Sequence, residues 1–378
     1  MLIKNCTIIY LDRIEKGSVL IKDGKIAEIN PTNLQDEEVL DAQGLYLAPG
    51  FIDVHIHGAG GHDTMDGTFE AINEISKVIV QRGTTSFTPT TMTMSAEDIV
   101  KSMSAIKKAK ENGTHGANVL GAHLEGPFIS LSAIGAQNPN FLLEPSIENF
   151  KKIVGDYEDA VVSLTLAPEV DGAKELIRYL TSKNIVASIG HTKATYEEAM
   201  EGIKCGCSHS THLFNAMSGF THRAPGVVGA IFDSEITAET ISDGIHIAYP
   251  SLRVAYKNKG TDKTLLVTDA MMACCMPDGK YSLGGQDVVV ENGAARLLNG
   301  ALAGSVLTLD NAVRNVFQNT DYPLNEVVKM ASYNPAKHCK VDHRKGQIKE
   351  GFDADLLLFD ENIEIKKVFV NGKLVHEN

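Results

Sequence analysis

Short runs of β-branched and apolar residues alternate with longer, helix-length segments through most of this chain, and no other feature limits its fold as strongly. Eight candidate strands lie at 50–57, 84–89, 118–125, 161–166, 185–191, 208–212, 236–243 and 263–269. Helix-length segments separate several of them, at 68–82, 96–111, 146–154, 172–182 and 195–204. Largely apolar strands that alternate with helices are typical of a parallel sheet buried on both faces. The alternation therefore predicts an α/β fold, a (β/α)8 TIM-like barrel.

The two ends of the chain have a different pattern from the middle. Residues 1–49 and 341–378 contain short strands separated by turn dipeptides such as Asn371–Gly372. Neither end is long enough to enclose a core alone, so we expect both to pack together as one small, discontinuous β-sandwich domain. The remaining residues, 50–340, are then the barrel and the catalytic domain. Within them, the Gly-rich stretch 277–304 predicts a hairpin excursion after the last barrel strand.

Charge and hydropathy limit the partners that the chain can bind. It has 378 residues, with 35 Lys and Arg against 48 Asp and Glu, and the net charge of −13 argues against nucleic-acid binding. Its apolar runs fall far below the roughly 20 residues that a membrane-spanning helix needs. The N-terminal apolar stretch is too short for a signal peptide, and the six cysteines form no CxxC motif. We therefore expect a cytoplasmic protein with reduced thiols and no contact with membranes.

Residues that bind metals or transfer protons stand at the ends of five candidate strands. In chain order they are His55 and His57, His123 and Glu125, His191, His212, and Asp269. The carboxyl ends of barrel strands meet at one rim, where functional side chains gather. Imidazole and carboxylate donors together suit a divalent ion such as Zn²⁺. The pattern predicts a metal-dependent hydrolase, with a set of structural histidines as the alternative.

Several motifs around these residues are more specific than the pattern alone. They are PGFIDVHIHG, HLEGPF, SIGHT, STHLFNAM, DGIH and LVTDAM, followed near the C-terminus by GQIKEGFDADLLLFD. Over nearly its whole length the chain resembles the N-acetylglucosamine-6-phosphate deacetylase family of the amidohydrolase superfamily. The resemblance implies removal of the N-acetyl group from N-acetylglucosamine 6-phosphate, which gives glucosamine 6-phosphate and acetate in amino-sugar catabolism. It also implies a divalent metal, Zn²⁺ first with Fe²⁺, Mn²⁺ and Co²⁺ as alternatives, and a homodimer.

The resemblance also implies roles for individual residues. The ligands of the principal metal correspond to Glu125, His191 and His212, and those of a second metal, present in some members, to His55 and His57. Asp269 corresponds to the catalytic aspartate, which takes a proton from water and then gives it to the departing nitrogen. Positions that contact the substrate correspond to Ala136, Gln137, Asn215, Ala216, Arg223, His246, Leu302, Ala303, Gly304 and Ser305.

Some positions depart from the family pattern or lack a clear role. Gln137 stands where some members have a histidine, and the loop after Asp269 carries Met272, Cys274 and Cys275 in place of more polar side chains. We expect the remaining histidines to be structural or on the surface: His62, His115, His209, His338, His343 and His376. Two alternatives stay open, namely another amidohydrolase, such as a cyclic-amide hydrolase or a related deacetylase, and a non-catalytic barrel scaffold.

Overall fold

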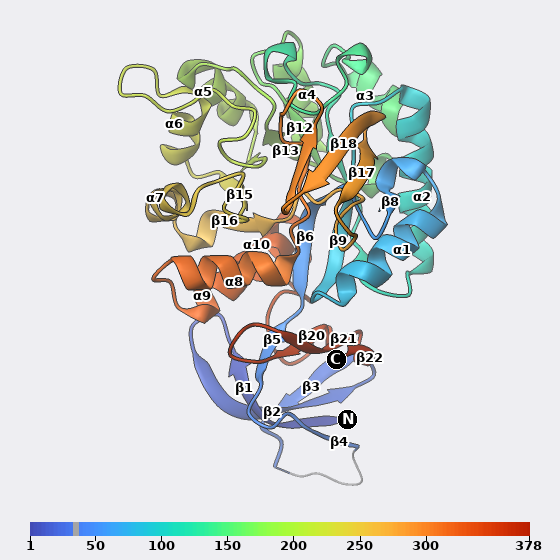
Figure 1. Ribbon diagram of the computed structural model, residues 1–378, viewed down its shortest axis with the longest axis vertical. Helices are drawn as coiled ribbons and strands as arrows, with labels where there is room; N and C mark the ends of the chain where they lie inside the picture. Colours follow the sequence, from blue (N-terminus) through green and yellow to red (C-terminus); the bar gives the residue numbers. More distant parts are fainter. Residues whose placement is uncertain (33–37) are drawn as a thin grey trace.

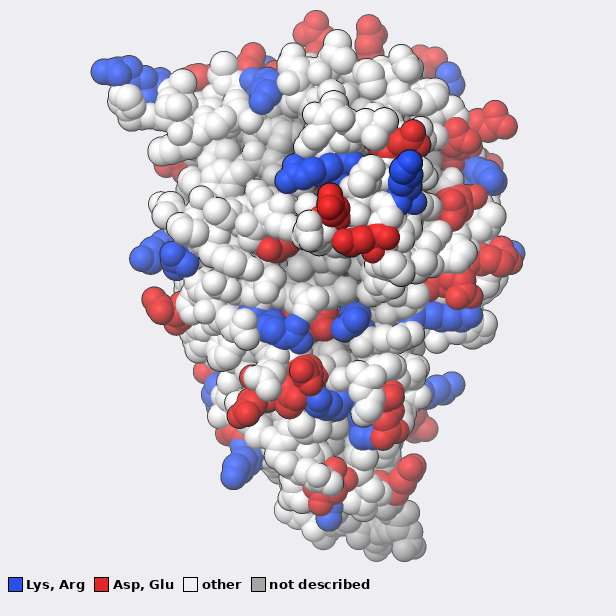
Figure 2. Space-filling model, viewed as in Figure 1, with Lys and Arg blue, Asp and Glu red and all other residues white. Residues whose placement is uncertain are grey.

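A barrel of parallel strands surrounded by helices sits above a smaller β region that contains both chain termini (Figure 1). The computed structural model describes residues 1–32 and 38–378. No helix in these ranges is long and apolar enough to cross a membrane. Acidic and basic side chains alternate over the face shown in Figure 2, and neither sign forms a broad patch there.

The barrel strands follow one another in chain order and all pair in parallel. They are β6 (Phe51–Ile56), β9 (Thr84–Thr91), β10 (Asn118–Val119), β11 (Ala122–Glu125), β12 (Val161–Leu166), β13 (Val186–Ile189), β14 (His209–Ser210), β15 (Thr237–Ile241) and β16 (Thr264–Val267). A parallel bridge between Ile56 and Ala270 brings the last strand back to the first. The predicted barrel is thereby confirmed. The third predicted strand is broken into β10 and β11 at Leu120 and Gly121, where Gly121 has φ 146°.

Helices cover the outside of the barrel, and all five predicted helices are present. These are α1 (Phe69–Val80), α2 (Ala96–Asn112), α3 (Ile147–Val154), α4 (Ala173–Ser182) and α5 (Tyr196–Cys205). Side-chain caps fix several of their starts: Thr195, for example, accepts a hydrogen bond from the peptide N–H of Glu198, whose carboxylate accepts from Thr195 N. Further helices complete the layer, namely α6 (Gly226–Phe232), α7 (Tyr249–Lys259), α8 (Leu309–Asn319), α9 (Leu324–Ala331) and α10 (Tyr333–His338). Short 3₁₀ turns are η1 (Thr64–Asp66), η2 (Leu131–Ala133), η3 (Pro139–Phe141), η4 (Glu158–Ala160) and η5 (Thr261–Lys263).

The two chain ends pack together as one β domain, as the sequence predicts, and its strands belong to a single sheet. Its strands are β1 (Leu2–Ile9), β2 (Ile14–Lys22), β3 (Lys25–Ile29), β4 (Val39–Asp41), β5 (Tyr46–Pro49), β20 (Leu356–Phe359), β21 (Ile365–Val370) and β22 (Lys373–Glu377). Antiparallel pairing of β5 with β20 joins the N-terminal half to the C-terminal half. Buried side chains from both ends share its core, among them Ile3, Val19, Leu47, Leu358 and Phe369. The sequence limits given above for the two domains stay a prediction.

The predicted hairpin excursion is a three-stranded antiparallel sheet above the barrel (Figure 1). It consists of β17 (Gly279–Leu283), β18 (Gln286–Glu291) and β19 (Ala294–Leu297). Leu283, Val288 and Ala303 form a small apolar core with Met271 and Met92 from the barrel rim. A two-stranded sheet of β7 (Gly58–Ala59) and β8 (His62–Asp63) follows the first barrel strand. Leu283 of the three-stranded sheet, with Leu302 and Gly304 just beyond it, lines the site described next.

Candidate active site

Three of the predicted site residues occupy the same place relative to their strands. His191, His212 and Asp269 each stand two residues beyond the end of a barrel strand. All three have left-handed backbone conformations, with φ of 47°, 27° and 49°. A left-handed conformation costs a non-glycine residue about 1–3 kcal/mol and persists where the surrounding structure enforces it, often at functional sites. The strand ends therefore carry strained backbone at the positions where chemistry is expected.

The predicted principal ligands form a tight cluster of donor atoms. His212 Nε2 lies 3.0 Å from Glu125 Oε1 and 3.1 Å from His191 Nε2, and His191 Nε2 lies 3.3 Å from the same Glu125 oxygen. Ligands placed tetrahedrally around Zn²⁺ at about 2.0–2.1 Å would lie about 3.3 Å from one another. The three atoms thus have the spacing of ligands around one ion.

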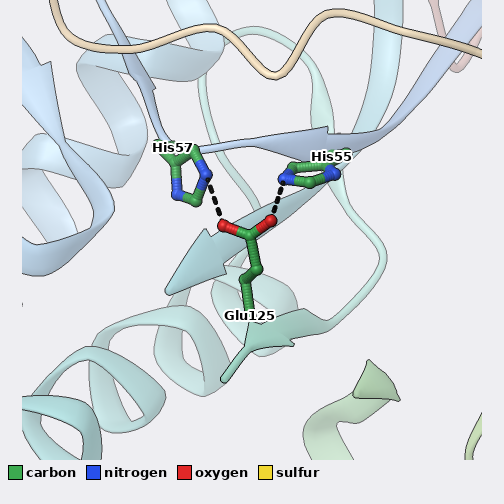
Figure 3. Close-up of side chains that lie close together, drawn as sticks. All are labelled: His55, His57 and Glu125. Atoms are coloured by element: carbon green, nitrogen blue, oxygen red, sulfur yellow. Dashed lines mark ion pairs between the residues drawn. The ribbon is translucent and has the colours of Figure 1, made fainter. Parts of the chain in front are cut away.

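A second cluster shares Glu125 with the first. His55 Nε2 lies 3.3 Å from Glu125 Oε1, and His57 Nε2 lies 3.2 Å from Glu125 Oε2. Figure 3 shows the two rings facing one carboxylate oxygen each. Asp269 Oδ1 completes the group at 3.5 Å from His55 Nε2 and 3.2 Å from His57 Nε2. Glu125 therefore lies between two donor sets, as a bridging ligand would.

Burial and charge act against each other in these clusters. Burial would raise the pKa of Glu125, but the imidazoles of His55, His191 and His212 hold that pKa well below its ordinary value. Burial likewise opposes the ionised form of Asp269, yet His55 and His57 keep its pKa lowered. Burial would lower the pKa of His57, whereas Asp269 and Glu125 raise it to about 9. Two buried carboxylates surrounded by imidazoles fit a divalent cation, which neutralises them and accepts the ring nitrogens as ligands.

The far side of three of the four rings, those of His55, His57 and His191, is held by an acceptor, whereas Nδ1 of His212 has no hydrogen-bond partner. His57 Nδ1 contacts the carbonyl of Thr90 at 3.2 Å, and His191 Nδ1 contacts that of Ala133 at 2.9 Å. His55 Nδ1 lies 2.9 Å from Oε2 of Glu239, a residue that the sequence analysis missed. A histidine that donates from Nδ1 presents the lone pair of Nε2, which is how ligating rings are commonly oriented. The only sequence signal for Glu239 was a single acid within an otherwise uncharged strand, β15.

A cavity of about 390 Å³ opens above the two clusters. Besides the metal-site residues His57, Glu125, His191, His212 and Asp269, the predicted residues that line it are Ala136, Gln137, Asn215, Ala216, His246, Leu302 and Gly304. The cavity is also lined by Lys193, which the sequence analysis missed and whose Nζ donates to the carbonyl of Met217 at 3.2 Å. The size is in the ordinary range for a small-molecule site.

Three predicted substrate positions lie away from this cavity. Ala303 is fully buried in the core of the hairpin sheet, and Ser305 donates its hydroxyl to the carbonyl of Thr268. Arg223 is exposed and contacts the neighbouring His222. Gln137 lines the cavity, but its Nε2 donates to Glu125 Oε2 at 2.6 Å. In this structure the amide nitrogen of Gln137 therefore binds Glu125, the carboxylate that the two donor sets share.

The structure also shows where two cysteines of the loop after Asp269 lie, and where three histidines outside the proposed ligand set lie. Cys274 is buried and Cys275 exposed, with 3.9 Å between their sulfur atoms. His209 and His338 are both buried, with ring centroids 4.3 Å apart. His123 lies beneath the clusters and bonds to Thr165 Oγ1 at 2.8 Å. Burial and the neighbouring His55 lower the pKa of His123 to about 3, so it is neutral.

A parallel barrel with histidine and carboxylate donors at the carboxyl ends of its strands defines a class, the metal-dependent barrel hydrolases. A family model described as the amidohydrolase family matches residues 46–375. The chain belongs to the amidohydrolase family.

Proteins similar to this chain carry more specific names. The N-acetylglucosamine-6-phosphate deacetylase of Lysinibacillus sphaericus is 41% identical over 377 residues, which cover 99% of this chain and 97% of that protein. The N-acetylgalactosamine-6-phosphate deacetylase of Escherichia coli O157:H7 is 33% identical, with 96% of this chain and 95% of that protein covered.

Solved structures agree over the full length. The crystal structure of N-acetylglucosamine-6-phosphate deacetylase from Pasteurella multocida matches with a TM-score of 0.94 and 32% identity, and covers 100% of this chain and 99% of that one. An aspartate-to-alanine variant of the Mycobacterium smegmatis enzyme, in complex with N-acetyl-D-glucosamine-6-phosphate, matches with a TM-score of 0.93 and 29% identity over 99% of both chains. These similarities extend to both the barrel and the sheet formed by the chain ends.

Proposed function

We propose that this protein hydrolyses N-acetylglucosamine 6-phosphate to glucosamine 6-phosphate and acetate. The observation that carries the proposal is the meeting of Asp269 with two donor sets that share Glu125, at the floor of a cavity of about 390 Å³. A buried carboxylate beside a cation site is what hydrolysis of an unreactive amide requires. The names of the similar proteins and the substrate bound to the M. smegmatis variant support the choice of substrate.

The proposed cofactor is a divalent metal, with Zn²⁺ preferred because the donors are imidazole nitrogens and carboxylate oxygens. Glu125, His191 and His212 would hold the principal ion, and His55, His57 and Asp269 would hold a second ion together with Glu125. Fe²⁺, Mn²⁺ and Co²⁺ are the alternatives. Such an ion lowers the pKa of a water molecule and polarises the amide carbonyl.

The protein's own residues would move the protons. Asp269 is ionised at neutral pH, because the neighbouring rings keep its pKa lowered despite burial. It would accept the proton of the attacking water and then donate it to the departing amino-sugar nitrogen, so one carboxylate serves as base and then as acid. His246 lines the cavity, and its Nδ1 lies 2.7 Å from Asp243 Oδ2. That contact orients the ring, and in its doubly protonated form the ring would also donate from Nε2 to the oxygen that becomes negative during attack.

The phosphate would bind at the cavity rim. Lys193 is the one Lys or Arg among the described residues that line the cavity, and it lies beside the loop of Asn215 and Ala216. An ammonium group and peptide N–H groups are common phosphate ligands. Arg223, exposed on the same loop region, is proposed as a further phosphate contact, since its planar guanidinium suits phosphate oxygens.

Acetate release and metal content test the function together. Purified protein is analysed for bound metals and then incubated with N-acetylglucosamine 6-phosphate, its galactosamine isomer, unphosphorylated N-acetylglucosamine and a cyclic amide. We expect the fastest release of acetate from the first substrate. Preference for the galactosamine isomer would identify the other deacetylase, and turnover of the cyclic amide alone would identify another amidohydrolase. Protein that stays inert after reconstitution with each of the four metals would be a scaffold.

We also propose that the protein is a cytoplasmic homodimer. Phe220 and Val254 are 61% and 55% exposed, and they line an apolar groove with Phe214, Phe232 and His246 beside the active-site cavity. Exposed apolar groups of this size favour a protein interface. Light scattering during gel filtration is expected to give twice the chain mass of 40.8 kDa, and a Phe220→Asp variant should run as a monomer.

A further inference from the structure

A buried carboxylate lies inside the barrel, below the two donor clusters. Glu239 projects from β15 and is 1% exposed. Its Oε2 lies 2.9 Å from His55 Nδ1 and accepts the peptide N–H of His212 at 3.0 Å. Its Oε1 lies 3.0 Å from His209 Nε2. Both oxygens are therefore occupied by nitrogen partners, and two of these partners belong to different donor sets of the proposed metal centre.

The partners of Glu239 are themselves fixed. His209 Nδ1 lies 2.6 Å from Thr237 Oγ1, and the ring of His209 packs at a tilt of 60° against that of His338, with 4.3 Å between the ring centroids. His209, Glu239 and His55 thus form a continuous polar column, which runs from the barrel interior up to Glu125. Each member is at most 1% exposed. The column is closed off from solvent. Water could therefore take the place of a removed side chain only by filling the cavity that the removal opens.

We propose that Glu239 is a positioning residue for the metal centre, which it serves by orienting the ring of His55 and the backbone of His212. A carboxylate only accepts hydrogen bonds, so His55 donates from Nδ1 and its Nε2 lone pair faces Glu125 and Asp269. The bond to the His212 N–H helps to hold that residue at φ 27°. The proposal rests on the metal-dependent function given above, but not on the identity of the substrate.

A competing interpretation is that Glu239 is itself a ligand. His55, His123 and Glu239 lie close enough for a separate cation. However, both oxygens of Glu239 already have nitrogen partners, and His123 Nε2 bonds to Thr165 Oγ1 at 2.8 Å. A cation there would have to displace these bonds. The contacts favour an orienting role.

The test compares Glu239→Gln with Asp310→Asn in metal binding. Asp310 is also a buried carboxylate, on α8, but its partners are Thr308 Oγ1 and Arg82, neither of which belongs to the proposed metal centre. Zn²⁺ affinity is measured by competition with a chromophoric chelator, and bound zinc is counted by mass spectrometry. For Glu239→Gln we expect the most weakly held ion to bind about 10- to 100-fold more weakly. For Asp310→Asn we expect a change below about twofold.

Unchanged affinity in a folded Glu239→Gln variant would overturn the proposal, as would a wild-type protein that binds three zinc ions or none. A measurement on the wild type covers the case in which the variant does not fold. In zinc-loaded protein labelled with ¹⁵N-histidine, NMR is expected to show His55 protonated at Nδ1, and protonation at Nε2 would refute the orientation. If zinc affinity and zinc content change as expected but the protein releases no acetate, only the assignment of the substrate is contradicted.

Discussion

Replacement of Asp269 by asparagine tests the proton transfer with little change of shape. Asparagine has the size of aspartate, and the backbone bonds of residue 269, from its N–H to the carbonyl of His55 and from Ser305 N to its carbonyl, do not involve the side chain. The variant loses the negative charge and the capacity to accept a proton. Because the pKa of Asp269 is lowered by His55 and His57 despite burial, the wild-type group is a competent base throughout the neutral range.

The expected loss follows from the role of a single general base. Such a group contributes about 10²- to 10⁴-fold, which corresponds to about 2.7–5.4 kcal/mol of transition-state stabilisation. The same carboxylate serves two transfers, but only the slower one sets kcat, so the two losses do not multiply. We expect kcat to fall within this range while the substrate Kd changes little.

The assay measures acetate release on protein whose metal content is known. Asp269 Oδ1 lies within 3.5 Å of both rings of the second donor set, so a lost ion could otherwise be mistaken for a lost base. Asp287→Asn, at an exposed position on β18, is the matched control and should keep wild-type activity. A kcat within tenfold of wild type, in Asp269→Asn protein with full metal content, would refute the role of Asp269.

Three further predictions follow from the site. Lys193→Met is expected to raise KM for the phosphorylated sugar by about tenfold or more, which is the effect of losing one charged hydrogen bond of about 1.5 kcal/mol. Arg223→Ala should act in the same direction. Equal effects on unphosphorylated N-acetylglucosamine would contradict both assignments. Removal of the metal by a chelator should lower the melting temperature, because an ion present at about 100 times its Kd stabilises the folded state by about 2.7 kcal/mol; calorimetry that finds no shift would argue against a bound ion. The hydrogen bond from Cys274 and the charge of Arg82 lower the pKa of Cys275 to about 7. Iodoacetamide should therefore modify this thiol first, at a rate that rises through pH 7, as followed by peptide mass mapping. Preferential labelling of Cys207, whose pKa is raised by burial, would be the contrary result.

The barrel and the main donor atoms could be predicted because their signals are local. Each strand is a short apolar run, and His55, Glu125, His191 and His212 stand at or just beyond a strand end. The closed parallel arrangement then brings those ends together whatever their separation in sequence. Spacing along the chain was therefore enough to predict the candidate site.

Other features depend on contacts that spacing does not reveal. Glu239 acquires its role from His55, 184 positions earlier in the chain, and a single glutamate in a strand gives no hint of that partner. Lys193 reaches the cavity because of how its loop meets Met217. Arg223 has a side chain suited to phosphate, but the fold leaves it exposed outside the cavity. In each case the path of a loop, or a neighbour across the barrel, determines what the side chain contacts.

The position of the termini has a practical consequence. Both lie in the sheet joined by β5 and β20, and β5 runs through Gly50 directly into β6, whose far end carries His55 and His57 (Figure 1). The cavity mouth therefore opens at the pole opposite to the two chain ends. A purification tag, a fusion partner or a solid support attached at either end would leave substrate entry unobstructed, so immobilised protein should work at the speed of the free enzyme.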